Sequence, residues 1–184
     1  MSSMPNLPKL ADALPVSDCL FDLAYIQPQI ARLAAEIDRD YAGDRPLYLT
    51  IMNGGMLFSS LLALQLKTDV EFDYLHATRY RGETFGGGVH WLRKPAVPLF
   101  GRRVLLIDDI LDEGHTLRAV IDACQAEGAK DVRVAVLARK DHDRCIADLQ
   151  ADYIGLDVPD RYVYGFGMDY YEQGRNLPAI YALR

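Results

Sequence analysis

Residues 104–117 have the sequence VLLIDDILDEGHTL, and this segment decides the fold. An uninterrupted run of Val, Leu and Ile is typical of a strand that is buried on both faces, as in a parallel sheet. Three acids and a turn of small residues follow the run. Because ligands of open α/β sheets bind beyond the carboxyl ends of the strands, Asp108, Asp109 and Asp112 are expected in a binding site.

The turn after this strand has the composition of a phosphate-binding loop. Asp112 to Thr116 lead into a predicted helix over residues 117–126, and free N–H groups at a helix N-terminus favour an anion such as phosphate. Gly114 permits close approach of the ligand, and the Thr116 hydroxyl adds a donor. The alternative for each acid by itself is a solvated turn or helix cap, because Asp is common at both. A nucleoside-triphosphate P-loop is not supported, since the residue before Thr116 is not Lys.

The rest of the chain predicts strands that alternate with helices. Such alternation implies an α/β fold with a mostly parallel sheet. Residues 81–98 are rich in Gly and charged residues and lack a clean period, which is typical of a flexible active-site loop or lid, with a solvated hairpin as the alternative. The predicted strands cover residues 47–52, 70–78, 103–107 and 132–138, and the predicted helices cover residues 29–40, 56–66 and 117–126.

Length and composition narrow the class of protein. The 184 residues fit a single domain over residues 1–184, and the net charge of −6 argues against a broad basic surface for nucleic acid. Three cysteines without C-x-x-C spacing indicate reduced thiols of a cytoplasmic protein, and the four histidines lack the spacing of zinc ligands. We also expect no membrane span, because no apolar run approaches roughly 18 residues.

Three segments together resemble one enzyme family. Two acids followed by D-x-G-x-T at residues 112–116 resemble the phosphoribosyl-diphosphate motif of the phosphoribosyltransferases. Residues 51–55 (IMNGG) are similar to the family's first active-site loop, while residues 158–170 (VPDRYVYGFGMDY) and 175–178 (RNLP) resemble the end of the hypoxanthine-guanine phosphoribosyltransferases. The segments keep the family's order, so the resemblance runs from about residue 45 to the end.

The resemblance implies a fold and an activity. The fold would be the type I phosphoribosyltransferase fold, an open, mostly parallel sheet flanked by helices with a small hood built from terminal segments, assembled as a homodimer or homotetramer. The activity would be transfer of the phosphoribosyl group from phosphoribosyl diphosphate to hypoxanthine or guanine, with Mg²⁺, giving IMP or GMP and diphosphate. Xanthine or adenine specificity and a non-catalytic nucleic-acid-binding regulator are the alternatives. Asp112 and the acidic total charge favour an enzyme.

The resemblance also implies a role for individual residues. Asp112 would be the catalytic acid/base near purine N7, and Arg79 with Tyr80 would begin the lid. Phosphoribosyl diphosphate would be bound by Asn53, Gly54, Asp108, Asp109, Glu113, Gly114, His115, Thr116 and Arg175. The purine would be bound by Lys140, Tyr162, Val163 and Asp169, and the metal by Asp108, Asp109 and Asp169.

Some positions depart from the family pattern or allow a second interpretation. Asn53 stands where many members carry Lys, and Arg79 replaces a small hydroxyl residue. The stretch from Arg139 to Asp152 is one residue longer than in common relatives, so Arg139 is the alternative to Lys140 for contact with the 6-oxo group. Tyr162 begins an alternation of aromatic residues that is also typical of the buried face of a strand, although the resemblance favours stacking on the purine.

Overall fold

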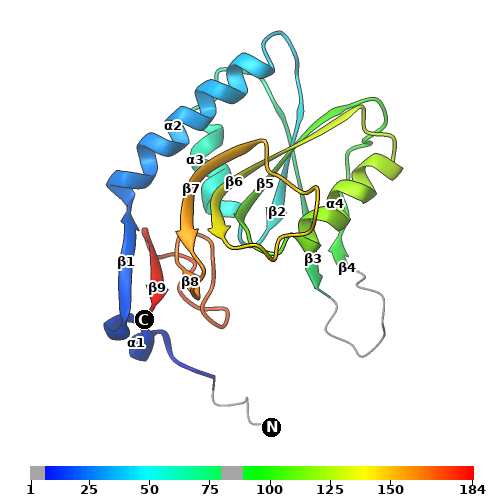
Figure 1. Cartoon of the computed structure of the whole chain (residues 1–184). Helices are drawn as coiled ribbons and strands as arrows, with labels where there is room; N and C mark the ends of the chain where they lie inside the picture. Colours follow the sequence, from blue (N-terminus) through cyan, green and yellow to red (C-terminus); the bar gives the residue numbers. More distant parts are fainter. Residues whose placement is uncertain (1–6, 80–88) are drawn as a thin grey trace.

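The structure is a computed structural model and describes residues 7–79 and 89–184. Within these ranges, a central sheet of six strands has the order β4-β3-β2-β5-β6-β7 (Figure 1). Its neighbouring strands are parallel except β4, which runs antiparallel to β3. The bounds are β2 (Leu47–Met52), β3 (Glu71–Arg79), β4 (Val89–Arg93), β5 (Arg103–Leu111), β6 (Asp131–Asp141) and β7 (Tyr153–Pro159).

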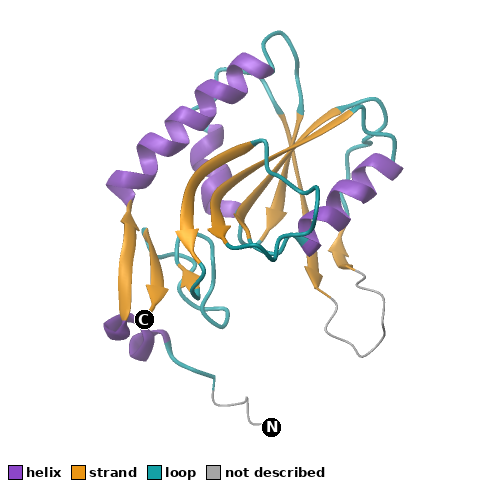
Figure 2. Cartoon of the chain, in the orientation of Figure 1, coloured by secondary structure: helices purple, strands orange, loops and turns teal. Residues whose placement is uncertain are grey.

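Helices cover both faces of the central sheet (Figure 2). The helices are α2 (Leu23–Asp40), α3 (Met56–Ala63) and α4 (His115–Ala126). Helices α2 and α3 share one buried apolar cluster with the sheet, and α4 shares another with its opposite face. The predicted α/β fold with a mostly parallel sheet is therefore confirmed.

Strand β5 is the centre of this arrangement. Its residues 104–107 are fully buried and alternate between the two clusters, with Leu105 facing α2 and α3 and Leu106 facing α4. This confirms a strand buried on both faces. The predicted end at residue 107 is wrong, because β5 keeps its parallel register with β6 as far as Leu111. Asp108 and Asp109 consequently lie on the strand itself.

The helix boundaries differ from the sequence prediction for local reasons. Helix α2 begins six residues earlier than predicted, because the Asp22 carboxylate accepts a hydrogen bond from the Tyr25 N–H at 2.9 Å and caps the first turn. Pro28 lies inside the helix and conceals this start in the sequence pattern. Helix α3 ends at Ala63, three residues before the predicted end, and α4 begins at His115.

The predicted irregular segment 81–98 is wrong over residues 89–93. These residues form β4, which pairs with β3 through partners such as Thr78 and His90. The buried Asp73 carboxylate then fixes the following turn, because it accepts hydrogen bonds from the N–H groups of Ala96 (2.6 Å) and Val97 (3.0 Å). The remainder of the predicted lid, residues 80–88 with Tyr80, lies outside the described residues.

A smaller sheet is built from segments near the two ends of the chain, as predicted for the hood. In the described part of the chain it has the antiparallel order β1-β9-β8. Its strands are β1 (Ser17–Asp22), β8 (Val163–Tyr164) and β9 (Ala179–Leu183), and the short helices α1 (Leu10–Ala13) and η1 (Leu14–Val16) precede it. Its core contains Ala13, Tyr164 and Tyr170.

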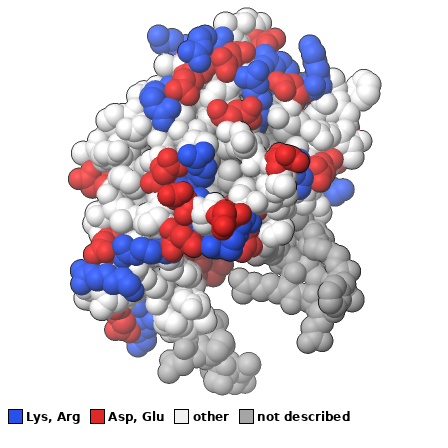
Figure 3. Space-filling view, in the orientation of Figure 1, with Lys and Arg blue, Asp and Glu red and all other residues white. Residues whose placement is uncertain are grey.

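The helices of the described residues bear on the question of a membrane span, and the charges on one face of the molecule bear on that of a basic surface. No helix within residues 7–79 and 89–184 is both long and apolar enough to cross a membrane. On the face drawn in Figure 3, Lys and Arg side chains are interspersed with Asp and Glu. The mixed charges of that face are not those of a surface adapted to nucleic acid.

Candidate active site

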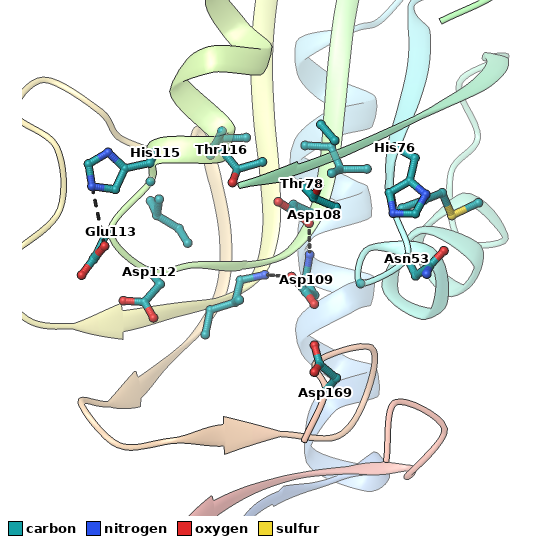
Figure 4. A pocket seen from close by; sticks show the side chains of 18 of the residues that line it. Asn53, His76, Thr78, Asp108, Asp109, Asp112, Glu113, His115, Thr116 and Asp169 are labelled. Atoms are coloured by element: carbon teal, nitrogen blue, oxygen red, sulfur yellow. Dashed lines mark hydrogen bonds and ion pairs between the residues drawn. The ribbon is translucent and has the colours of Figure 1, made fainter. Parts of the chain in front are cut away.

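A hollow of about 500 Å³ lies at the carboxyl ends of β2, β3 and β5 (Figure 4). Strand β2 has β3 on one side and β5 on the other, so the strand order reverses at this point. Such a reversal is where ligands of open α/β sheets bind. The lining comprises residues 51–54 after β2, 76–78 of β3, 108–117 after and within β5, and the C-terminal residues Asp169, Glu172 and Arg175.

Two adjacent carboxylates form the floor of this hollow. The Asp109 N–H donates to Asp108 Oδ1 at 3.0 Å, and the Ile110 N–H donates to Asp109 Oδ1 at 2.7 Å. Burial and the charge of Asp109 raise the pKa of Asp108 well above its ordinary value. Burial also raises the pKa of Asp109, although the Ile110 N–H and the Arg175 charge oppose this shift. The pair therefore favours a ligand that brings positive charge or hydroxyl donors.

Two glycines allow the loops around these acids to pack closely. A Cβ atom on Gly54 would lie 2.0 Å from Asp109 Oδ2, and one on Gly167 would lie 2.2 Å from the Gly54 carbonyl oxygen. Gly167 also has a φ of +105°. The first active-site loop, strand β5 and the C-terminal loop consequently meet at a place with no room for side chains.

The turn into α4 is built around Gly114 and faces the first hollow. Gly114 caps the helix with a φ of +83°, a conformation that other residues rarely adopt. The Glu113 carbonyl accepts a hydrogen bond from the Ile146 N–H at 3.0 Å, which ties the turn to the loop after β6. Glu113, Gly114, His115 and Thr116 all line the hollow, so the N-terminus of α4 opens onto it.

A second hollow of about 380 Å³ adjoins the first and shares Asp109, Ile110, Asp112 and Asp169 with it. The further lining residues are Lys140, Tyr162, Val163 and Met168. All four predicted purine-binding residues are thus brought together beside the predicted acid/base.

The structure distinguishes Lys140 from its neighbour. The Lys140 Nζ lies 2.6 Å from Asp112 Oδ2 inside the second hollow. The Arg139 Nε instead donates to Asp157 Oδ1 at 2.8 Å, and its side chain is half exposed. Only Lys140 of the two therefore lines the hollow that Tyr162 and Val163 also line.

The aromatic alternation does not place Tyr162 in the core. Strand β8 contains only Val163 and Tyr164, so the alternating residues do not share one strand. Tyr164 and Phe166 are buried, whereas Tyr162 is 44% exposed and lines the second hollow. The buried-strand interpretation is wrong for Tyr162.

Sequence reasoning missed two groups of residues at the site. His76 and Thr78 enter the first hollow from β3, because the carboxyl ends of neighbouring parallel strands meet at one edge. His142 Nε2 lies 2.6 Å from Asp112 Oδ1, on the side opposite Lys140. The signal for His142 was its spacing of two residues from Lys140, since such residues share a face of an extended chain.

The C-terminal loop brings a cation to the edge of the acidic floor. Arg175 pairs with Asp169 at 2.8 Å and Glu172 at 3.1 Å, and donates to the Gly167 carbonyl at 2.8 Å. Among the residues that the structure describes, no group of three His, Cys, Asp or Glu side chains is arranged to hold a metal ion. Asp108, Asp109 and Asp169 therefore do not form a three-ligand metal site by themselves.

Comparison with known proteins identifies the family. Residues 19–172 match the model of the phosphoribosyl transferase domain. The chain belongs to the phosphoribosyltransferase family. Over 170 residues it is 34% identical to a hypoxanthine-guanine phosphoribosyltransferase of Streptococcus thermophilus, covering 92% of this chain and 94% of that protein. A Bacillus subtilis protein of the same name is 33% identical over 160 residues, covering 86% of this chain and 88% of that protein.

Solved structures agree with the sequence relatives. The crystal structure of a hypoxanthine phosphoribosyltransferase from Staphylococcus aureus superposes with a TM-score of 0.85 at 30% identity, covering 91% of each chain. A hypoxanthine-guanine-xanthine phosphoribosyltransferase gives a TM-score of 0.82 at 28% identity, covering 91% of this chain and 96% of that one. The resemblance to this enzyme family and the type I fold predicted from it are confirmed.

Proposed function

We propose that this enzyme serves purine salvage by transferring the 5-phosphoribosyl group of phosphoribosyl diphosphate to hypoxanthine or guanine. The observation that carries the proposal is the meeting of two hollows at Asp109 and Asp112. One hollow offers a helix N-terminus suited to a phosphate, and the other offers a cation and an aromatic ring suited to a 6-oxopurine. The reacting carbon of the ribose and the reacting nitrogen of the purine would meet where the two hollows join.

The phosphoribosyl side would be held by the first hollow. The backbone of Glu113 to Thr116 would bind the 5′-phosphate at the N-terminus of α4, where N–H groups and the helix dipole favour an anion. Asp108 and Asp109 would accept hydrogen bonds from the ribose hydroxyls. Their carboxylates would also lie beside the sugar, where they would stabilise the positive charge that develops on it during transfer.

The leaving diphosphate needs positive charge near this acidic floor. Carboxylate oxygens are the ligands that Mg²⁺ prefers, and Mg²⁺ usually takes one or two of them and completes its shell with water and phosphate oxygens. Asp108, Asp109 and Asp169 fit this pattern as partial ligands. Bound Mg²⁺ would neutralise part of the negative charge of the diphosphate. Arg175 would add a donor at the same edge, while Asn53 and Gly54 offer an amide side chain and backbone groups.

The purine would occupy the second hollow. Tyr162 is exposed on one side and can stack on the ring, and the Val163 carbonyl can meet the ring edge. Lys140 would donate to the 6-oxo group, and Asp112 would take the proton from N7 as the glycosidic bond forms. Adenine would be disfavoured, because the Lys140 ammonium has no acceptor for a 6-amino group.

The test is an assay of four bases with phosphoribosyl diphosphate and magnesium. We expect hypoxanthine and guanine to be used with higher kcat/KM than xanthine, and adenine to be disfavoured by roughly a hundredfold or more. Efficient use of adenine would contradict the proposed specificity. Absence of nucleotide product with all four bases would contradict the proposed reaction.

A further inference from the structure

We infer that His142 is a positioning residue that holds the Asp112 carboxylate in place when Lys140 turns to the purine. The motivating observation is that Asp112 lies between two donors, with Lys140 Nζ 2.6 Å from Oδ2 and His142 Nε2 2.6 Å from Oδ1. The inference rests on the proposed function for the roles of Asp112 and Lys140. Nothing in that function requires His142.

The surroundings of His142 fix the proton on one ring nitrogen. The Arg144 backbone N–H donates to Nδ1 at 3.1 Å, so Nδ1 must carry a lone pair. The ring proton is then on Nε2, directed at Asp112 Oδ1. The side chain is only 3% exposed, and the ring cannot turn away without leaving two hydrogen bonds in a buried place. His142 is therefore a fixed N–H donor to Asp112.

The same hydrogen bonds exclude a proton relay through the imidazole. A relay would require Nδ1 to release a proton while Nε2 accepts one, but Nδ1 accepts from Arg144 and holds no proton. The proton that Asp112 takes from the purine must leave by another route. What His142 offers is orientation of the carboxylate and stabilisation of its ionised form.

The need for a second donor follows from the position of Lys140. Its Nζ would bond to Asp112 in the free protein and to the 6-oxo group when the base is bound, because its side chain lines the purine hollow. As Lys140 turns, Oδ2 of Asp112 loses its partner and becomes available to the N7 proton. The bond from His142 to Oδ1 remains and keeps the carboxylate at the same angle.

The electrostatic consequence has a definite sign. Burial raises the pKa of Asp112, but the hydrogen bonds from Lys140 and His142 outweigh burial and hold that pKa below its ordinary value. Loss of the His142 bond would raise the pKa of Asp112. The acid must be ionised to accept a proton, so activity would then be lost at a higher pH on the acidic side. The charged or titratable groups that share these surroundings are Asp109, Glu113, Arg139, Lys140, Asp141, His142, Arg144, Cys145, Asp160, Tyr162 and Asp169.

The test compares two amides of different reach. His142→Gln places an amide N–H near the position of Nε2, whereas the shorter His142→Asn leaves its amide near Nδ1 and out of reach of Asp112. We expect His142→Asn to lower kcat for hypoxanthine by about tenfold, with KM for phosphoribosyl diphosphate unchanged, since the lost bond is to a charged group. The acidic limb of its pH profile should move up by about one pH unit. His142→Gln should stay within about threefold of the wild type, with the limb in place.

Several outcomes would overturn the inference. Wild-type kcat and pH profile in His142→Asn would show that the bond does not matter, and equal losses in both variants with an unmoved acidic limb would show that the ring only packs. A measurement on the wild-type protein tests the inference even if the variants fail to fold. In proton–nitrogen correlation spectra of the histidine-labelled protein, the ring proton of His142 should be on Nε2, and a proton on Nδ1 would refute the assignment.

The same experiments separate this inference from the proposed function. If the wild type makes no nucleotide from any purine, the proposed function fails. The pKa of Asp112, measured by carboxyl carbon NMR, still decides whether His142 acts on it. A higher pKa of Asp112 in His142→Asn than in the wild type and His142→Gln would support the inference, and equal values in all three proteins would contradict it.

Discussion

Replacing Lys140 by Met should remove the preference for 6-oxopurines while keeping the shape of the side chain. Lys140 is 13% exposed and lines the purine hollow with its Nζ beside Asp112. Met has a similar length but no donor, so the 6-oxo group would be left without a partner. An unmade hydrogen bond in such a place costs about 1–3 kcal/mol. Since about 1.4 kcal/mol is a factor of ten, kcat/KM for hypoxanthine should fall by roughly ten- to a hundredfold.

Adenine should respond differently. Its 6-amino group faces a donor in the wild type and a neutral thioether in Lys140→Met, so its kcat/KM should stay constant or rise. The ratio of hypoxanthine to adenine efficiency should therefore fall at least about tenfold. The measurement is steady-state kinetics on both bases at saturating phosphoribosyl diphosphate and magnesium.

Arg139→Met is the matched control for this experiment. Arg139 precedes Lys140 but pairs with Asp157 at the surface, and exposed ion pairs contribute little, so its kinetics should stay within about threefold of the wild type. Loss of the base preference in Arg139→Met, with the preference retained in Lys140→Met, would refute the assignment of Lys140. It would also show that the hollow lined by Tyr162 is not the purine site.

Three further predictions concern the acids. Asp112→Asn should lower single-turnover rates by about two decades with phosphoribosyl diphosphate still bound, because an amide cannot accept the purine proton; a rate within about threefold of the wild type would remove it from the mechanism. Affinity for phosphoribosyl diphosphate should depend on magnesium, because Asp108 and Asp109 oppose a bare diphosphate; equal affinities by calorimetry with and without chelator would contradict this. Asp73→Asn should lower the free energy of unfolding by about 2 kcal/mol, since two backbone N–H groups would face an amide, while Asp69→Asn at the exposed surface should change it little. Hydrogen bonds outweigh burial and lower the pKa of Asp73, so its contribution is present above about pH 4 and is lost as the pH falls; urea curves for Asp73→Asn that show the wild-type pH dependence would count against it.

Much of the fold could be predicted because the buried strands have long apolar runs. Residues 104–107 are buried on both faces, and the strand predicted at 47–52 has the observed bounds. The predictions failed where contacts between distant segments of the chain determine the local structure. The extension of β5 through Asp108 and Asp109 depends on its pairing with β6. The fixed turn after β4 depends on the hydrogen bonds that Asp73 accepts from Ala96 and Val97. Neither contact is visible in the local sequence.

The candidate site could be predicted where a residue type and its spacing carry the chemistry. Asp112 and the turn to Thr116 stand beside the hollow because the end of a parallel strand and the start of a helix position them together. The spacing of two residues from Lys140 indicated a shared face for His142, but the contact with Asp112 was not predicted, because the two residues lie 30 positions apart in the chain. The close packing of Gly54 against Gly167 could not be predicted from the sequence either, because it brings together two loops that are far apart in the chain.

The order of strands in the hood has a consequence for how this protein is made. Strand β9 lies between β1 and β8, so neither outer strand has its neighbour in that sheet until β9 (Ala179–Leu183) has been made. The central sheet pairs strands that end by Pro159 and can begin to form earlier during synthesis. Contacts between segments so distant in the sequence form slowly. We therefore expect the phosphate side of the site to take shape first, and the base side, with Tyr162 and Val163 beside β9, to form only once β9 has been made.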